Sequence, residues 1–172
     1  MLLTLDGILT DPPYLPRLSL GSHALAADGD DAVHPETRVH TLVVDDDADL
    51  RLSLRFLLES EGYSVDEARD GGEALAYLRD HTEPIVVLLD LMMPRVDGTA
   101  MLQAVAADPQ LAQRNAYVIV TANRERLPLE MSPLLARLRV PIVTKPYDLD
   151  KMLGVIARSA GRLRDESSGE RH

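Results

Sequence analysis

The chain has 172 residues, of which 28 are acidic and 18 basic, so its net charge is −10. This charge disfavours binding to nucleic acid, and the absence of cysteine excludes disulfides, thiol nucleophiles and Cys-based zinc sites. Apolar residues make up 45% of the sequence, enough for one core, and no apolar run is long enough to span a bilayer. We therefore expect a cytoplasmic protein that contacts neither DNA nor a membrane.

The two ends of the chain differ in composition from the middle. Residues 1–38 contain four prolines and the acidic run Asp28–Asp31, and we expect them to form a disordered extension. Residues 39–162 show the pattern of one folded domain, and residues 163–172 form a polar tail.

The first half of the domain alternates strands and helices. Strands are predicted at 39–44, 63–68 and 85–89, separated by helices over about 50–58 and 71–81. The run 85–89 is apolar at every position, which is typical of a strand covered on both faces. The first strand ends in Asp45–Asp47 and the third ends in Asp90.

The second half continues the alternation after a loop at 92–98 with the turn chemistry of Pro and Asp-Gly. A helix is predicted at 99–107, a strand at 118–120, a weak helix at 124–139, a strand at 141–144 and a final helix at 149–163. Pro128 and Pro133 are expected to shorten or bend the weak helix. The final helix has apolar residues at intervals of three and four.

Five strands alternating with five helices predict a parallel sheet with helices on both faces, an α/β three-layer sandwich. We expect the flavodoxin-like, doubly wound strand order 2-1-3-4-5, in which ligands bind beyond the carboxyl ends of the strands. Four predicted strands have a polar side chain at that end. These side chains belong to Asp45, Asp46, Asp90, Thr121 and Lys145.

This set of side chains favours phosphoryl chemistry. Three neighbouring carboxylates repel one another, and a divalent cation with oxygen ligands relieves that repulsion; Mg²⁺ suits a site with few carboxylates and several waters. Lys145 adds a positive charge and Thr121 a hydroxyl donor. A carboxylate beside a cation and a lysine can act as a nucleophile and form an acyl phosphate.

Four segments of the sequence resemble the receiver domains of two-component response regulators. They are Leu42–Asp47, Leu88–Gly98, Val118–Ala122 and Val143–Tyr147, and the resemblance covers residues 39–162. It implies a phosphorylation switch rather than an enzyme: a single-domain response regulator in a phosphorelay, which assists its own phosphorylation and dephosphorylation.

The resemblance also implies roles for individual residues. Asp90 would accept a phosphoryl group from the phosphohistidine of a sensor histidine kinase or a phosphotransfer protein. Thr121 would hydrogen-bond the phosphoryl oxygen, Lys145 would pair with the phosphoryl group, and the Lys145–Pro146 peptide bond would be cis.

The metal site follows from the same resemblance. Asp45, Asp46 and Asp90 would hold Mg²⁺ or Mn²⁺, and the main-chain carbonyl of Met92 would supply a further oxygen.

One position departs from the family pattern. Three residues before the lysine the family usually has an aromatic residue that moves inward on activation, and here it is Ile142. Our hypothesis is that the face formed by 124–139, 141–144 and 149–163 recognises an unusual output protein.

Two other functions remain open on the sequence. A haloacid-dehalogenase-like phosphatase would use Asp45 and Asp47 as its Asp-x-Asp motif, but the acidic pair it needs near the fourth strand is replaced by Thr121–Asn123. A pseudo-receiver would act without phosphate, although every site residue is present. The remaining acids have structural readings: Asp47 and Asp49 at the start of the first helix, and Asp97 as a cap or turn residue. Met92 and Met93 are expected in loop and core packing.

Overall fold

The computed structural model describes residues 40–93, 96–122, 124 and 127–169, with side chains as far as residue 165. A five-stranded parallel sheet has the order β2-β1-β3-β4-β5. The strands are β1 (His40–Val44), β2 (Val65–Ala68), β3 (Ile85–Leu89), β4 (Ala116–Thr121) and β5 (Ile142–Thr144). The predicted flavodoxin-like fold and strand order are confirmed. The predicted extension at 1–38 lies outside the described residues.

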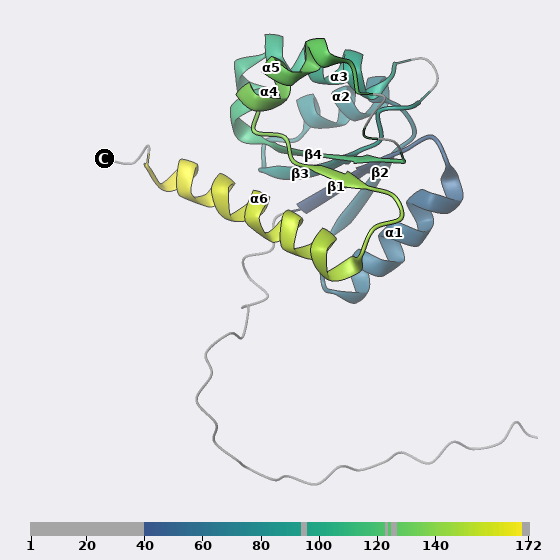
Figure 1. The fold of residues 1–172 in the computed structure, drawn as a ribbon. Coiled ribbons are helices and arrows are strands. Elements are labelled where there is room, and N and C mark those ends of the chain that lie inside the picture. The colour runs from purple at the N-terminus through teal and green to yellow at the C-terminus, as the bar shows by residue number, and fades with distance from the viewer. Residues whose placement is uncertain (1–39, 94–95, 123, 125–126, 170–172) are drawn as a thin grey trace, which may run out of the picture. The chain divides into compact units, whose positions relative to one another are not determined.

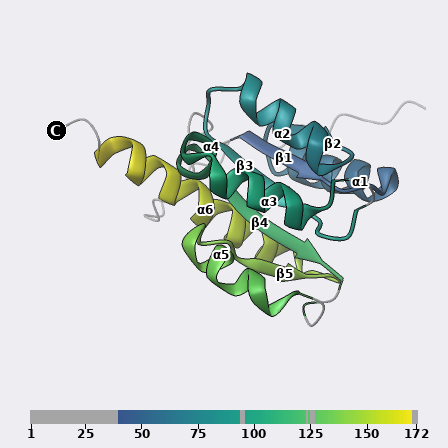
Figure 2. The ribbon, with the colours of Figure 1, turned by 90° about the horizontal axis from the view of Figure 1, so that it is seen from above.

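Helices cover both faces of the sheet (Figures 1 and 2). One layer contains α2 (Gly71–Asp80), α3 (Gly98–Ala107), α4 (Pro109–Arg114) and α5 (Ser132–Arg137), and the other contains α1 (Ala48–Ser60) and α6 (Leu149–Gly169). This arrangement gives the three layers that the sequence predicts.

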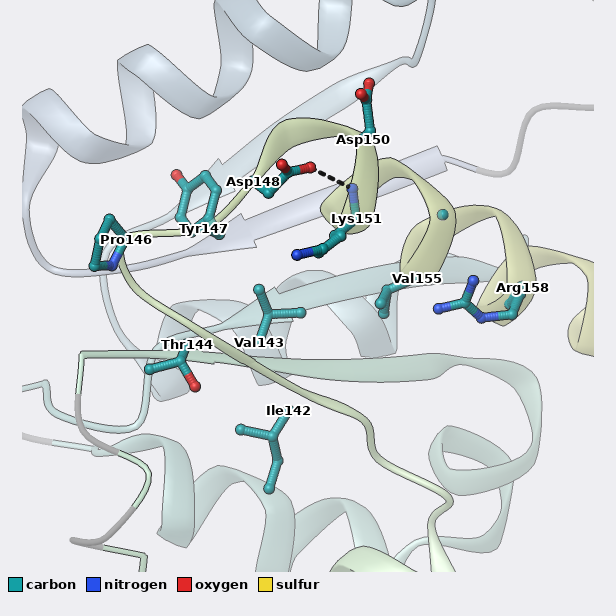
Figure 3. A pocket seen from close by; sticks show the side chains of 11 residues that line it. Ile142, Val143, Thr144, Pro146, Tyr147, Asp148, Asp150, Lys151, Val155 and Arg158 are labelled. Carbon is teal, nitrogen blue, oxygen red and sulfur yellow. Dashed lines mark hydrogen bonds between the residues drawn. The ribbon is translucent and has the colours of Figure 1, made fainter.

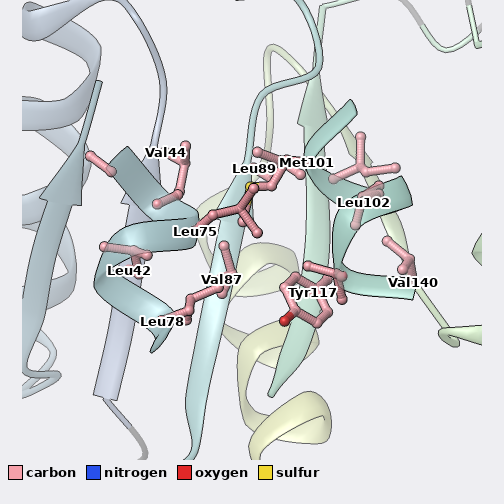
Figure 4. Close-up of a cluster of buried hydrophobic side chains, with 14 of the residues drawn as sticks. Leu42, Val44, Leu75, Leu78, Val87, Leu89, Met101, Leu102, Tyr117 and Val140 are labelled. Carbon is pink, nitrogen blue, oxygen red and sulfur yellow. The ribbon is translucent and has the colours of Figure 1, made fainter. Parts of the chain in front are cut away.

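The core is divided by the sheet into two apolar clusters. Val87 and Leu89 of β3 pack in the cluster under α2 and α3, part of which Figure 4 shows, whereas Val86 and Leu88 pack in the cluster under α1 and α6. All four side chains are at most 2% exposed. Full burial of one such side chain contributes roughly 1.5–3 kcal/mol, so the two clusters together strongly stabilise β3 at the centre of the sheet.

Three helices differ from the sequence prediction. The short helix α4 was not predicted; Asp108 caps it by accepting from the N–H groups of Gln110 and Leu111, and Pro109 is its first residue. Instead of the one helix predicted at 124–139, the described residues 127–139 contain a 3₁₀ turn, Leu129–Met131, and the short helix α5, with a proline at the start of each. Helix α6 continues to Gly169, beyond the end predicted at 163, since the polar residues that follow include no proline that would interrupt it.

A polar cluster lies near the amino-terminal edge of the sheet. The Asp66 carboxylate accepts a hydrogen bond from the Tyr77 hydroxyl, and its Oδ2 lies 2.8 Å from Nε2 of His40. The Tyr77 ring also stacks on His81 with a centroid separation of 3.8 Å. The Tyr77 hydrogen bond, helped by the nearby His40, lowers the pKa of Asp66 against the opposing effect of burial.

Candidate functional site

Three aspartates meet at the carboxyl edge of the sheet. Asp45 and Asp46 directly follow β1 and Asp90 directly follows β3; these strands are neighbours, and the Asp90 N–H donates to the Val44 carbonyl over 2.8 Å. One carboxylate oxygen from each aspartate lies within 4.8 Å of the others. Asp45 is buried, Asp90 is half-buried and Asp46 is exposed, so the cluster opens to solvent on the Asp46 side.

Lys145, which directly follows β5 and is far from the aspartates in sequence, adds a positive charge to this cluster. Its Nζ donates to Oδ2 of Asp45 over 2.7 Å and to Oδ2 of Asp90 over 3.3 Å. Its main-chain N–H donates to the Thr121 carbonyl, and the peptide bond to Pro146 is cis, as the resemblance implies. Burial lowers the pKa of Lys145, but the hydrogen bond to Asp45 and the charge of Asp90 outweigh burial, so the pKa lies above its ordinary value.

The charges at the site leave room for a cation. Two carboxylates 4.8 Å apart repel by roughly 3.5 kcal/mol at an effective dielectric of 20. Lys145 supplies one positive charge against the three negative charges of Asp45, Asp46 and Asp90. A divalent cation would balance the remaining two, and the exposed Asp46 side of the cluster allows the water ligands that Mg²⁺ retains. The donor set therefore fits Mg²⁺ or Mn²⁺.

The loop after β3 is held close to Asp90. Oδ1 of Asp90 accepts from the Met92 N–H over 3.1 Å, and the Gly98 N–H donates to the Leu91 carbonyl over 3.2 Å. A Cβ at Gly98 would lie 2.5 Å from the Asp90 carbonyl oxygen, which only a glycine avoids. Asp97 caps α3 through the Ala100 N–H, the cap role expected from the sequence. The Met92 side chain is exposed in this loop, and a metal-ligand role for its carbonyl remains a prediction.

Thr121 and Ile142 lie on the two strands at the β5 edge of the sheet. Thr121 is the last residue of β4 and its side chain is buried, at the same edge of the sheet as Asp90. Ile142 is the first residue of β5, half-buried, and packs against the apolar cluster under α3. Ile142 thus lies at the edge of the apolar core, at the position where receiver domains usually have an aromatic residue.

Sequence reasoning did not single out Arg51. This α1 residue donates from Nη1 to the main-chain carbonyl of Asp45 over 2.8 Å, and its Nε lies 3.3 Å from Oε2 of Glu67 in β2. The contact joins three separate segments, and a surface arginine in a helix pattern carries no local signal for it. Asp47 caps α1 through the N–H groups of Asp49 and Leu50, as the sequence predicts.

A doubly wound fold with an acidic cluster and a lysine at the carboxyl edge defines a class of signalling domain, and comparison with known proteins agrees. The family profile of the response regulator receiver domain matches residues 41–157. The chain is 35% identical over 132 residues to "Response regulator MprA" of Mycobacterium sp. strain KMS, covering 77% of this chain and 54% of that protein. It is 29% identical over 128 residues to "Probable chemotaxis protein CheY" of Rhizobium etli, covering 74% and 96%.

Among solved structures, the receiver domain protein (CheY-like) of Methanospirillum hungatei JF-1 matches with a TM-score of 0.64 and 30% identity, over 73% of this chain and 97% of that one. The chain therefore belongs to the family of response regulator receiver domains of two-component systems. It spans about half the length of the MprA relatives that it matches. Within the part of the chain that the structure describes, no helix is both long and apolar enough to cross a bilayer.

Proposed function

We propose that Asp90 accepts a phosphoryl group from the phosphohistidine of a sensor histidine kinase or a phosphotransfer protein. The observation that carries this proposal is the bridge from Lys145 Nζ to Asp45 and Asp90, at 2.7 and 3.3 Å, within a cluster of three carboxylates. Membership of the receiver family supports the same chemistry. The domain acts as a switch and not as an enzyme with a small-molecule substrate.

The transfer forms one bond and breaks another. A carboxylate oxygen of Asp90 attacks the phosphorus atom, the P–N bond to the donor histidine breaks, and its electron pair stays on the imidazole nitrogen. Lys145 already contacts Asp90 and can pair with the incoming phosphoryl oxygens. Thr121 hydrogen-bonds a phosphoryl oxygen after transfer.

Asp45, Asp46 and Asp90, with the Met92 carbonyl, hold Mg²⁺ or Mn²⁺ in this proposal. The cation would neutralise the negative charge of the phosphoryl oxygens and the three carboxylates. The close approach of the three carboxylates and the open Asp46 side support this assignment.

Acetyl phosphate tests the proposal without a known kinase. Incubation with acetyl phosphate and Mg²⁺ should add the mass of one phosphoryl group, and EDTA or Asp90→Asn should abolish the addition. Asp97→Asn is the matched control: it makes the same chemical change seven residues away in the same loop, and asparagine caps a helix about as well as aspartate. A phosphate adduct that persists in Asp90→Asn would refute Asp90 as the acceptor.

The same assay separates the two other functions. A haloacid-dehalogenase-like phosphatase would turn over a phosphate ester and lose that turnover in Asp45→Asn, while Asp90→Asn kept it. A pseudo-receiver would acquire no phosphate from any donor, whether acetyl phosphate, phosphoramidate or a phosphorylated kinase domain.

The output face in this proposal comprises α5, β5 and α6. An open groove of about 750 Å³ lies on its β5 and α6 side. Figure 3 shows that its lining comes from β5, the segment that contains Tyr147, and the first turns of α6, which include Lys151. We expect an output protein, rather than DNA, to bind here. Phosphorylation should shift the amide NMR signals of residues 124–145, and unchanged signals would exclude this face as the output surface.

A further inference from the structure

Arg51 joins α1, β2 and the segment that carries two of the three clustered aspartates. Its side chain is only 16% exposed, which is low for an arginine of a surface helix. Nη1 donates to the Asp45 carbonyl over 2.8 Å, while Nε faces Oε2 of Glu67 at 3.3 Å. The guanidinium is therefore held at two of its nitrogens by groups from different elements.

The carbonyl that Arg51 holds belongs to the peptide unit between Asp45 and Asp46. A peptide unit is planar, so fixing its oxygen also restrains the Asp46 nitrogen and Cα, which lie in the same plane. On the other side of Asp45, its N–H donates to the Ala68 carbonyl over 3.2 Å. The Asp45 carboxylate accepts from the Asp47 N–H over 2.9 Å and from Lys145. With Arg51 in place, the main chain is constrained on both sides of Asp45.

We propose that Arg51 is a positioning residue for the divalent cation, which acts by holding the Asp45–Asp46 peptide so that both carboxylates face one ion. Glu67 keeps the guanidinium in place. This inference rests on the proposed function, since it assigns a role toward the same cation. Groups that orient metal ligands without touching the metal typically affect metal affinity by 10–100-fold.

Arginine, rather than lysine, suits this position. A guanidinium presents several donors in a rigid plane, so it can bind the Asp45 carbonyl and Glu67 together, whereas an ammonium on a flexible chain keeps the charge without that geometry. The Arg51→Lys variant therefore keeps the positive charge at this position and removes the guanidinium geometry, so it tests the positioning role by itself.

Arg55 provides a matched control one turn further along α1. It contacts the same Glu67, with Nη1 3.3 Å from Oε1, and pairs with Glu59 at 2.8 Å. Its guanidinium hydrogen-bonds these two glutamates rather than the Asp45 carbonyl, and its side chain is 45% exposed. Arg55→Lys thus perturbs the same charge network and leaves the aspartate peptide untouched.

Mn²⁺ affinity, measured by EPR of the free ion without any phosphoryl donor, is the primary test. We expect Arg51→Lys to weaken Mn²⁺ binding roughly tenfold, and Arg55→Lys to stay within about twofold of the unchanged protein. In metal-free protein, the amide protons of Asp46 and Asp47 should exchange faster in Arg51→Lys than in Arg55→Lys.

A second measurement separates positioning from loss of structure. With acetyl phosphate as donor, Arg51→Lys should raise the Mg²⁺ concentration for half-maximal phosphorylation roughly tenfold while keeping most of the maximal rate. A damaged fold would instead lower the maximal rate without moving the half-saturation point. If thermal unfolding shows that Arg51→Lys does not fold, Glu67→Gln replaces it in the test, because this variant keeps Arg51 and all three aspartates. We expect Glu67→Gln to bind Mn²⁺ more weakly than Arg55→Lys does.

The outcomes distinguish the two proposals. If the wild-type protein neither binds Mn²⁺ nor takes up phosphate, the proposed function is wrong. If the wild-type protein does both, and the Arg51→Lys and Arg55→Lys variants bind Mn²⁺ with equal affinity, the positioning role of Arg51 is wrong. The proposed function is then unaffected.

Discussion

Gly98 is the position where one added methyl group would reach the site most directly. It is the first residue of α3, and a Cβ there would lie 2.5 Å from the Asp90 carbonyl oxygen and 2.8 Å from the Leu91 Cα. Both distances are well inside the 3.4 Å at which ordinary contacts begin, and both atoms belong to the main chain, so no side-chain rotation relieves the overlap. Gly98→Ala therefore has to move the backbone of Asp90 or of α3.

The expected magnitude follows from two opposing effects. Overpacking of this kind costs about 1–3 kcal/mol or more, and the better helix propensity of alanine returns at most about 1 kcal/mol. We expect the free energy of unfolding to fall by about 2 kcal/mol, which lowers the Tm by roughly 8 °C for a domain of this size. Because the overlap involves Asp90, the phosphorylation rate with acetyl phosphate at saturating Mg²⁺ should fall by about tenfold or more.

Gly161→Ala is the control for this prediction. Gly161 lies within α6, and a Cβ there meets nothing within 4 Å. The same substitution should therefore stabilise the domain by up to about 1 kcal/mol and leave the phosphorylation rate unchanged. Thermal unfolding and mass spectrometry measure both effects. If Gly98→Ala were as stable and as reactive as the unchanged protein, the argument from close packing at Asp90 would be wrong.

Three further predictions concern stability. The Thr41 hydroxyl is buried with no hydrogen-bond partner among the described residues, so Thr41→Val should raise the unfolding free energy by about 1 kcal/mol in urea denaturation; a loss of stability would indicate a hidden partner. The pKa of Asp66 is lowered in the folded state, so Asp66 contributes stability above its ordinary pKa of 3.8, and this stability is lost as the pH falls through the folded pKa. Asp66→Asn and Tyr77→Phe should each flatten the decline in stability below pH 3.8. An unaltered acid denaturation profile would contradict this prediction. Mg²⁺ at about 100 times its dissociation constant should stabilise the domain by about 2.7 kcal/mol, an effect that EDTA and Asp46→Asn remove; the same stabilisation in Asp46→Asn would place the ion elsewhere.

Most of the fold follows from local patterns. The apolar run at 85–89 could only be a strand covered on both faces, and in the structure every one of its residues is buried. Likewise the prolines at 128 and 133 correctly indicated that the helix predicted at 124–139 would be short. The six-residue helix α4 was missed because so short an element shows no helical repeat; its Asp-Pro start was the available signal.

The sequence by itself determined the strands and the acidic residues that end β1 and β3, because the pattern of apolar and polar side chains is a local property of the chain. The strand order was an expectation from doubly wound topology, which the structure confirms. It also placed Asp45, Asp46, Asp90, Thr121 and Lys145 at one edge of the sheet, because parallel strands bring their carboxyl ends together. Only the tertiary structure decided which atoms touch. The Lys145 amine reaches Asp45 across 100 residues of sequence, and a contact between groups so distant depends on the packing of whole elements.

The contact from Arg51 to the Asp45 carbonyl is of the same kind, since it requires α1 to lie over β2 with Glu67 facing it. Such contacts involve main-chain atoms, which every residue has, so no residue type in the sequence marks where they form. The candidate residues of the site could be named from the chain, whereas the contacts that Arg51 and Lys145 make with its aspartates became visible only in the folded domain.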